Sequence, residues 1–169
     1  MRAPEVTIRP GRDADLEQVN ELYNHYIATS PATFDLDPWT IERRREWFSH
    51  YATSGRYRLL VATEGDRVLG FTTSSMHRPK QAYETSVETT VYAAPDALGR
   101  GVGAALYSAL FELLAGEDVH RAYAGITMPN PASVALHERF GFVRAGLYTE
   151  QGRKFGRYWD VAWFEKPLG

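Results

Sequence analysis

The chain has 169 residues and a mass of 19.1 kDa, a length typical of one folded domain. Hydrophobic residues make up 44% and charged residues 24%, which excludes disorder and collagen-like repeats. The formal net charge of -2 creates no global field for nucleic acid or anionic membranes, and the absence of cysteine excludes disulfides, thiolate metal sites and cysteine nucleophiles.

Other classes are excluded by pattern. The five histidines do not pair at a metal-ligand spacing, so no metal site is expected. No apolar run approaches the roughly 18 residues that would span a bilayer. The stretch from Arg2 to Asp15 is polar and lacks the apolar core of a signal peptide, so we expect a cytoplasmic protein.

The first third of the chain alternates between strand and helix signals. Residues 5–9 alternate polar and apolar side chains, as a strand does. Residues 13–29 predict an amphipathic helix with Asp13 as its N-cap. A loop over residues 30–38 follows, and residues 40–51 predict a second helix whose inward side chains are Ile41, Trp47 and Phe48.

Three strands come next. Residues 58–63 and 68–75 are rich in apolar and β-branched side chains and flank the turn at residues 64–66, which predicts a hairpin. Residues 85–93 predict a third strand that ends before Pro95.

The segment 91–106 carries the strongest signal for ligand binding. Glycines at 99, 101 and 103 open a helix predicted over residues 104–114, and unpaired N–H groups at a helix start favour a pyrophosphate. Arg100 is a candidate for an additional charged contact. A tight loop that caps the helix is the alternative. The spacing matches neither the dinucleotide fingerprint nor a P-loop.

The remaining elements complete an α/β (α+β) pattern. Residues 122–127 predict a strand, residues 130–140 a short helix, and residues 142–148 and 157–164 two further strands. About seven strands and four helices in this order require a mixed central sheet flanked by helices.

Two segments together resemble the GCN5-related N-acetyltransferase (GNAT) superfamily. These are the strand with its glycine turn, VYAAPDALGRGVGAAL at 91–106, and the helix NPASVALHERFGF at 130–142. The phrases SVETTVYAAP at 86–95 and KFGRYWDVAWF at 154–164 further resemble the phosphinothricin acetyltransferase group. Two positions depart from the pattern: Leu98 stands where the family usually has Gln or Arg, and Asp35 follows Phe34 where herbicide-detoxifying members usually carry Arg.

The resemblance implies one N-acetyltransferase domain over residues 1–169 with a GNAT fold and acetyl-CoA as co-substrate. It implies that a set of residues contacts acetyl-CoA, through backbone pairing with pantetheine or around the pyrophosphate: Val91, Tyr92, Ala93, Gly99, Arg100, Gly101, Val102, Gly103, Ala104 and Asn130. It also implies Glu88 as the general base on the amine, and His137 where many relatives place a Tyr that protonates the leaving thiolate.

Physical chemistry is consistent with these roles. An ammonium group must lose a proton before it attacks a thioester, and a partly buried carboxylate such as Glu88 can accept it. An outward-facing Glu on a half-exposed strand is the alternative, as a packed or surface histidine is for His137. The Val91 N–H is a natural oxyanion donor. Direct transfer in a ternary complex is favoured because the chain has no thiol.

The resemblance implies a small-molecule amine that carries a carboxylate, such as phosphinothricin, methionine sulfoximine or methionine sulfone. Arg78 is the favoured cationic partner over Lys80, since Arg binds carboxylate or phosphinate bidentately; surface charge is the alternative. Phe34 and Tyr83 are candidate walls for the substrate side chain, or core aromatics.

The aromatic content of 13%, with tryptophans at 39, 47, 159 and 163, predicts a homodimer interface, as does the habit of the group. Two alternatives stay open for function. One is a GNAT enzyme that acts on a polyamine or a protein N-terminus; the other is a catalytically silent acyl-CoA-binding module.

Overall fold

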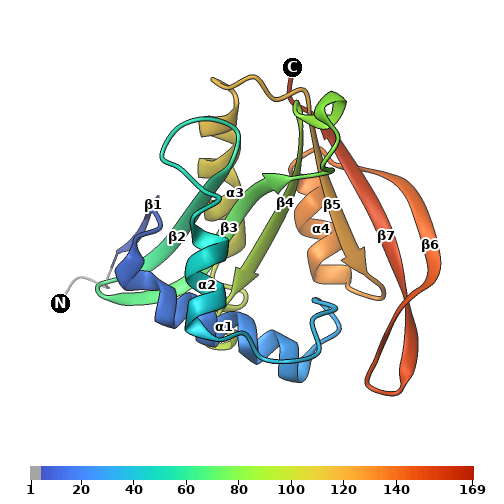
Figure 1. Cartoon of the computed structure of the whole chain (residues 1–169), viewed down its shortest axis with the longest axis horizontal. Helices are drawn as coiled ribbons and strands as arrows, with labels where there is room; N and C mark the ends of the chain where they lie inside the picture. The colour runs from blue at the N-terminus through green and yellow to red at the C-terminus, as the bar shows by residue number, and fades with distance from the viewer. Residues whose placement is uncertain (1–4) are drawn as a thin grey trace.

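One seven-stranded sheet organises the computed structural model, which describes residues 5–169 (Figure 1). Its strand order is β1-β2-β3-β4-β5-β7-β6. The bounds are β1 Val6–Pro10, β2 Arg58–Glu64, β3 Arg67–Met76, β4 Ser86–Ala93, β5 Arg121–Thr127, β6 Val143–Lys154 and β7 Arg157–Pro167. Only β4 and β5 pair in parallel among these strands; the other neighbours are antiparallel. The expected mixed sheet is confirmed. Arg2, where the polar N-terminal stretch begins, lies outside the described residues.

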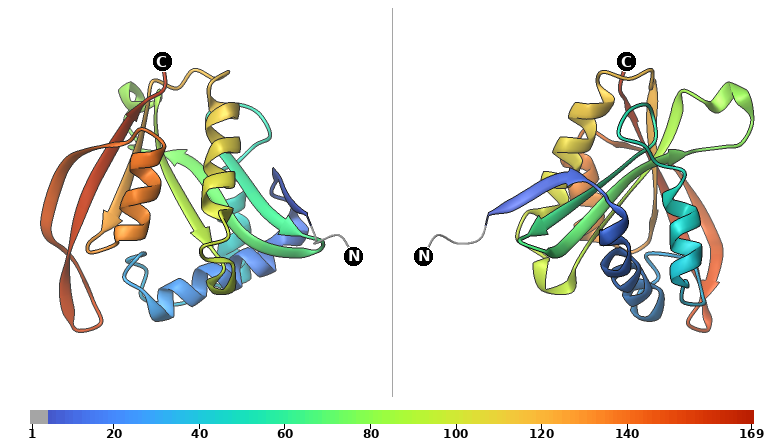
Figure 2. Two further views of the ribbon diagram at one scale, coloured as in Figure 1. Left: turned by 180° about the vertical axis from the view of Figure 1, so that it is seen from behind. Right: turned by 60° about the vertical axis from the view of Figure 1, so that its left-hand side comes forward.

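Four α-helices cover the two faces of the sheet. They are α1 Leu16–Thr29, α2 Ile41–Phe48, α3 Val102–Leu114 and α4 Pro131–Arg139. Helices α1 and α2 lie on one face, and α3 and α4 lie on the other (Figures 1 and 2). Short 3-10 turns at Asp13–Asp15, Gln81–Tyr83 and Pro95–Ala97 complete the set. Within residues 5–169, no helix has the length and apolar character needed to cross a bilayer.

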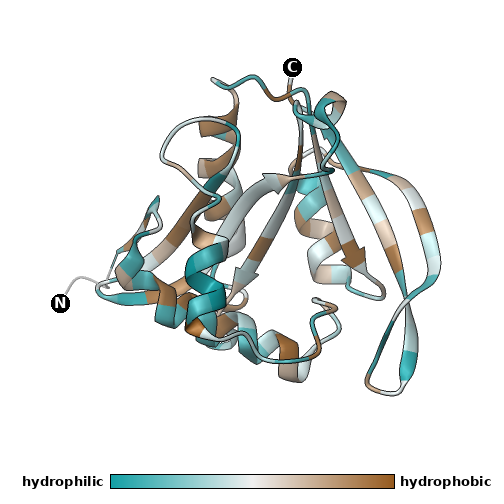
Figure 3. Ribbon diagram, viewed as in Figure 1, coloured by the Kyte–Doolittle hydropathy of each residue, from teal (hydrophilic) through white to brown (hydrophobic). Residues whose placement is uncertain are grey.

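The hydrophobic core packs the sheet against α3 on one face and against α1 on the other, where Val19 and Leu22 are buried. Leu106, Leu110 and Leu114 recur at four-residue steps on one side of α3 and are fully buried in one cluster with strand residues that include Leu60 and Ala62 of β2. The apolar bands of these elements contrast with the mostly hydrophilic α2 (Figure 3). The packed side of α3 therefore fixes the helix start at the ends of the central strands.

Several element boundaries differ from those predicted. Helix α1 begins at Leu16, after a 3-10 turn, and Asp15 rather than Asp13 makes the local contacts. The Asp15 carboxylate accepts the Arg12 N–H at 2.7 Å and pairs with the Arg9 guanidinium at 2.7 Å. Strand β6 runs to Lys154, beyond the end predicted at residue 148. The sequence did not reveal the added part because this exposed, polar half of the strand has no apolar alternation.

Candidate active site between β4 and β5

The site lies where two parallel strands part. Pairing of β4 with β5 is recorded for Ser86, Val87 and Glu88 only, so beyond Glu88 the two strands separate within the described chain. The gap is a cavity of about 710 Å³. Most residues that the sequence assigned to acetyl-CoA line this cavity: Val91, Tyr92, Ala93, Gly99, Gly101, Val102, Gly103, Ala104 and Asn130.

The glycine turn presents backbone rather than side chains to this cavity. Gly99 and Gly101 adopt φ angles of +75° and +80°, and a Cβ added to either would meet no described atom within 4 Å. Helix α3 begins directly after the turn, and its first intrahelical bond joins the Ala105 N–H to the Gly101 carbonyl at 3.0 Å. The preceding helical N–H groups are therefore free for a ligand.

Arg100 does not line the cavity. Its guanidinium pairs with Glu64 at 2.6 Å. Glu64 is thus the partner of the Arg100 guanidinium here, and the charged contact of Arg100 to phosphate stays a prediction. Asn130 does lie on the wall, and its Oδ1 accepts the Ser133 N–H at 3.1 Å, so it also caps α4.

The backbone of Val91 faces the gap. The Ala94 N–H donates to Leu69 of β3 at 2.8 Å, and antiparallel pairs alternate the direction of their N–H groups. By this alternation Val91 and Ala93 direct their polar groups away from β3, toward the side where β5 has parted. The Ala93 carbonyl there accepts the Tyr26 hydroxyl at 2.7 Å. The Val91 N–H is thus directed at the cavity.

Glu88 stands at the point where the strands part, on the wall of the same cavity. Its side chain is 35% exposed, and burial raises the pKa of its carboxyl group, while the positive charge of Arg78 lowers that pKa by a smaller amount. The His77 Nδ1 lies 3.8 Å from Glu88 Oε2, and the His77 ring stacks on Tyr123 with centroids 4.4 Å apart.

His137 is buried and held on both sides of its ring. Its Nδ1 lies 2.7 Å from the Ser133 carbonyl oxygen and its Nε2 lies 2.8 Å from the Tyr107 hydroxyl. Because a carbonyl only accepts, Nδ1 carries the proton and Nε2 accepts from Tyr107. Burial lowers the pKa of His137 and raises that of Tyr107, so both groups are neutral at pH 7.

Tyr107 is a site residue that sequence reasoning missed. Its hydroxyl lies 3.3 Å from Thr89 Oγ1, and the side chain lines the cavity. A spacing signal existed: Tyr107 falls on the same side of α3 as Gly103, Leu110 and Leu114, the side that faces the sheet and the cavity.

The three predicted substrate residues do not gather in one place. Arg78 and Tyr83 are exposed on the loop between β3 and β4, which projects from the molecule (Figure 2). Phe34 packs its ring against Gly152 at the β6–β7 hairpin. None of these three residues lines the cavity between β4 and β5. Arg78 is the one of the three whose charge reaches Glu88.

Comparison with known proteins agrees with this geometry. Residues 19–142 match the model of the Acetyltransferase (GNAT) family. A phosphinothricin N-acetyltransferase of Streptomyces coelicolor is 58% identical over 97% of this chain and 97% of its own. A methionine sulfoximine/methionine sulfone acetyltransferase of Pseudomonas aeruginosa is 33% identical over 96% and 94%.

A solved structure extends the likeness to three dimensions. The phosphinothricin acetyltransferase from Sinorhizobium meliloti, in complex with acetyl-CoA, superimposes with a TM-score of 0.91. It is 33% identical and the match covers 97% of this chain and 89% of that chain. The resemblance to the phosphinothricin acetyltransferase group is confirmed. The chain belongs to the acetyltransferase (GNAT) family.

Proposed function

We propose that this member of the acetyltransferase (GNAT) family acetylates the primary α-amine of a small amino acid or analogue, with acetyl-CoA as donor. The observation that carries the proposal is the position of Glu88. This carboxylate of raised pKa stands where β4 and β5 part, on the wall of the cavity that the glycine turn closes at its other end.

The residues around the gap suit acetyl-CoA. The free N–H groups at the start of α3 and the open space over Gly99 and Gly101 are suited to a pyrophosphate, and Val91 offers its backbone to the amide-containing pantetheine arm. Tyr92, Ala93 and Asn130 would complete the contacts. When bound, acetyl-CoA supplies the thioester whose acetyl group is transferred.

Glu88 is the general base in this proposal. Its raised pKa makes the carboxylate a better proton acceptor for the substrate ammonium than an exposed Glu, and Glu88 takes up that proton at a carboxylate oxygen. The Val91 N–H lies three residues further along β4 and is directed into the same gap, where it can stabilise a developing oxyanion. Because the chain has no cysteine, we favour direct transfer in a ternary complex.

His137 acts through Tyr107. A neutral His137 that accepts a hydrogen bond at Nε2 has no free proton toward the cavity, and Tyr107, which lines the cavity, donates its one hydroxyl proton to that Nε2. We therefore propose the acid role expected of His137 for the pair: the Tyr107 hydroxyl turns from His137 Nε2 toward the cavity and gives its proton to the leaving thiolate, and the phenolate left on Tyr107 takes a proton back from water before the next turnover.

Charge on the β3–β4 loop supports the substrate class. Arg78 is an exposed cation whose charge lowers the pKa of Glu88, and we propose that it attracts the α-carboxylate of an amino acid whose amine reaches Glu88. A polyamine offers no such carboxylate. The similar proteins named for phosphinothricin and for methionine sulfoximine and sulfone act on substrates of this class.

We also propose a homodimer that forms through β6. This strand is the last in the sheet and twelve residues long, and its exposed large side chains include Val143, Leu147 and Tyr148, which are 59%, 41% and 54% exposed. A long exposed edge strand with apolar side chains favours pairing with another chain. Light scattering would measure the mass, and a monomer at micromolar concentration would refute the dimer.

The test of the function is release of free CoA thiol across a panel of amines. The panel contains phosphinothricin, methionine sulfoximine, methionine sulfone, unmodified amino acids, spermidine and a short peptide. We expect turnover of amino acids and their analogues. Turnover of spermidine or peptide alone would reject the substrate class, and acetyl-CoA binding without any turnover would favour the silent binding module.

A further inference from the structure

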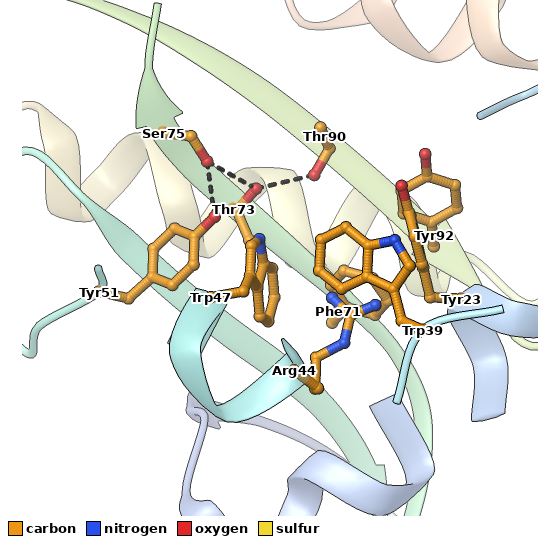
Figure 4. A pocket seen from close by; sticks show the side chains of 10 residues that line it. All are labelled: Tyr23, Trp39, Arg44, Trp47, Tyr51, Phe71, Thr73, Ser75, Thr90 and Tyr92. Carbon is orange, nitrogen blue, oxygen red and sulfur yellow. Dashed lines mark hydrogen bonds between the residues drawn. The ribbon is translucent and has the colours of Figure 1, made fainter. Parts of the chain in front are cut away.

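A second cavity lies under α2, on the face of the sheet opposite α3. Its volume is about 100 Å³, and helices α1 and α2 meet strands β3 and β4 around it (Figure 4). The lining residues fall into a ring of aromatic side chains, a set of hydroxyl groups and one cation, Arg44. None of the roles proposed above uses Arg44.

Arg44 is a buried cation without a carboxylate. The side chain is 1% exposed, and its guanidinium lies 4.1 Å from the ring centroid of Trp39 and 4.5 Å from that of Trp47. Its Nε donates to Asn20 at 3.1 Å, but within residues 5–169 its Nη2 has no hydrogen-bond partner and no carboxylate pairs with it. Burial lowers its pKa to about 10, so Arg44 stays protonated at neutral pH.

The nearest acidic side chain is already engaged. Asp35 accepts the Tyr23 hydroxyl at 2.5 Å and pairs with Arg43 at 3.6 Å. A buried positive charge with a free N–H is unfavourable unless an acceptor compensates it. The fold therefore keeps one charged donor unsatisfied in the wall of a cavity.

A second free donor points to the same kind of ligand. The indole Nε1 of Trp39 is also buried and without a partner among the described residues. On the other side of the cavity, the hydroxyls of Tyr51, Ser75, Thr73 and Thr90 form a chain of hydrogen bonds (Figure 4). A guanidinium, an indole N–H and hydroxyls together favour a group that carries acceptor oxygens and negative charge.

The register of β3 and β4 places this cavity beside Glu88. Three cross-strand pairs follow one another on the α1/α2 face: Phe71 with Tyr92, Thr73 with Thr90, and Ser75 with Glu88. The first two pairs and Ser75 line the small cavity, and Glu88 completes the third pair. Thr90 and Tyr92 line both cavities, so the two spaces are neighbours.

The distance from Glu88 to the rings around Arg44 determines which group of a substrate can reach the small cavity. The rings around Arg44 pack on the Phe71–Tyr92 pair, and Tyr92 is four residues from Glu88, about 13 Å along an extended strand. An α-carboxylate is one carbon from the amine and must stay near Glu88. Only a group at the far end of the substrate side chain can approach Arg44.

We propose that the cavity under α2 binds an oxyanion at the far end of the amine substrate, a phosphinate or carboxylate, with Arg44 Nη2 and Trp39 Nε1 as donors. This inference rests on the proposed acetylation of an amino acid. It gives Arg44 the specificity for the distal group and leaves Arg78 near the α-carboxylate. The same donors can bind a free inorganic oxyanion, a source that the experiment separates.

The experiment compares R44M with R43M. Arg43 is the neighbouring residue, half-exposed, with its guanidinium 4.0 Å from the same Trp39 ring, so R43M removes an equal charge outside the cavity. Each variant is assayed with phosphinothricin, which has a distal phosphinate, and with methionine, which has no distal charge. The readout is the ratio of the two kcat/KM values.

We expect R44M to lower this ratio roughly 10- to 100-fold, the usual effect of losing a hydrogen-bonded charge, and R43M to leave it within about twofold. Since an apolar residue in place of an uncompensated buried charge is often neutral or stabilising, the Tm of R44M should equal or exceed that of wild type. An unchanged ratio in a folded R44M protein would overturn the proposal. If R44M does not fold, R44K provides a second test, because it keeps the positive charge but loses the planar guanidinium with its paired N–H donors.

Binding measured without turnover keeps this test separate from the proposed function. Calorimetry with phosphinothricin alone, and with sodium sulfate alone, is carried out on wild type and R44M. If no amine is acetylated but phosphinothricin binds wild type and not R44M, the function fails and the subsite stands. If sulfate binds through Arg44 while phosphinothricin binds both proteins equally, the cavity holds a free inorganic anion only and the proposal fails.

Discussion

The two faces of the sheet at β4 present different chemical groups to a ligand. On the α3 face, the cavity wall includes backbone donors: a glycine turn, the first N–H groups of α3 and the edge of β4 from which β5 has parted. On the α1/α2 face, the small cavity is formed by side chains, with Arg44 held among aromatic rings. Glu88 lies between them.

This difference separates two tasks. Backbone donors recognise a pyrophosphate whatever the neighbouring side chains are, so the α3 face suits a co-substrate common to a whole family. Side chains from separate segments can differ between relatives without disturbing that turn, so the α1/α2 face suits the choice of amine. Substitutions on one face, on the other face, or at Glu88 between them should therefore have separable effects.

The largest effect is expected where the faces meet. E88Q removes the proton acceptor while it keeps the size of the side chain, so kcat should fall roughly 100-fold or more, the usual scale for a general base. Acetyl-CoA affinity should stay within about twofold, because Glu88 is not part of the glycine turn. Steady-state kinetics with phosphinothricin and calorimetry with acetyl-CoA measure the two quantities.

E84Q is the matched control for E88Q, since Glu84 is an exposed glutamate on the preceding loop. It should retain wild-type kcat. If E88Q also retained wild-type kcat and pH–rate profile, Glu88 would not be the base, and the two faces would meet at some other group.

A second prediction acts on the α3 face alone. G101A forces a side chain into a φ of +80°, which costs about 1 kcal/mol and misdirects the N–H groups of the turn, so acetyl-CoA should bind roughly 10-fold more weakly. G65A is the control, because Gly65 has a φ of +60° and similar open space at the β2–β3 turn. G65A should lose similar stability and no affinity. Equal acetyl-CoA affinity in both variants would mean that the glycine turn does not bind the pyrophosphate.

The two faces also differ in how far the sequence revealed them. The strand, the glycine turn and the helix of the α3 face are contiguous, so segment 91–106 predicted them from local pattern. Arg100 was expected to contact the pyrophosphate, and a single sequence does not reveal that Glu64 of β2 pairs with its guanidinium.

The α1/α2 face was not found, although one signal was present. In ERRRE at 42–46, a run of charges indicates a solvated helix, yet Arg44 lies three residues after Ile41 and four before Phe48, on the side predicted to face inward. The rings that bury it come from distant segments as well, including Tyr23 and Trp39. Tertiary packing alone brings these together, so Trp39 and Trp47 looked like interface residues.

A third prediction concerns the hydrogen-bonded pair of Tyr107 and His137. Y107F leaves Nε2 of His137 buried without its donor, which should destabilise the fold by about 1–3 kcal/mol. Because the hydroxyl also lines the cavity, kcat should fall about 10-fold, less than the loss of a general base. Chemical unfolding and steady-state kinetics measure the two effects. A stability loss with unchanged kcat would make the pair purely structural.

The smallest effect is a shift in pH dependence, and it tests how Arg78 is coupled to Glu88. Burial raises the pKa of Glu88 above the ordinary value of about 4.3, and the charge of Arg78 partly opposes that rise. In R78M the opposing charge is gone, so the Glu88 pKa should rise further and the acidic limb of kcat/KM should move to higher pH, by less than about one unit. K80M, on the same exposed loop, is the control for a general change in surface charge. Because both variants use the same amine, the ionisation of the substrate cancels in the comparison. A limb that moves to lower pH in R78M, or equally in both variants, would mean that Arg78 does not act on the base.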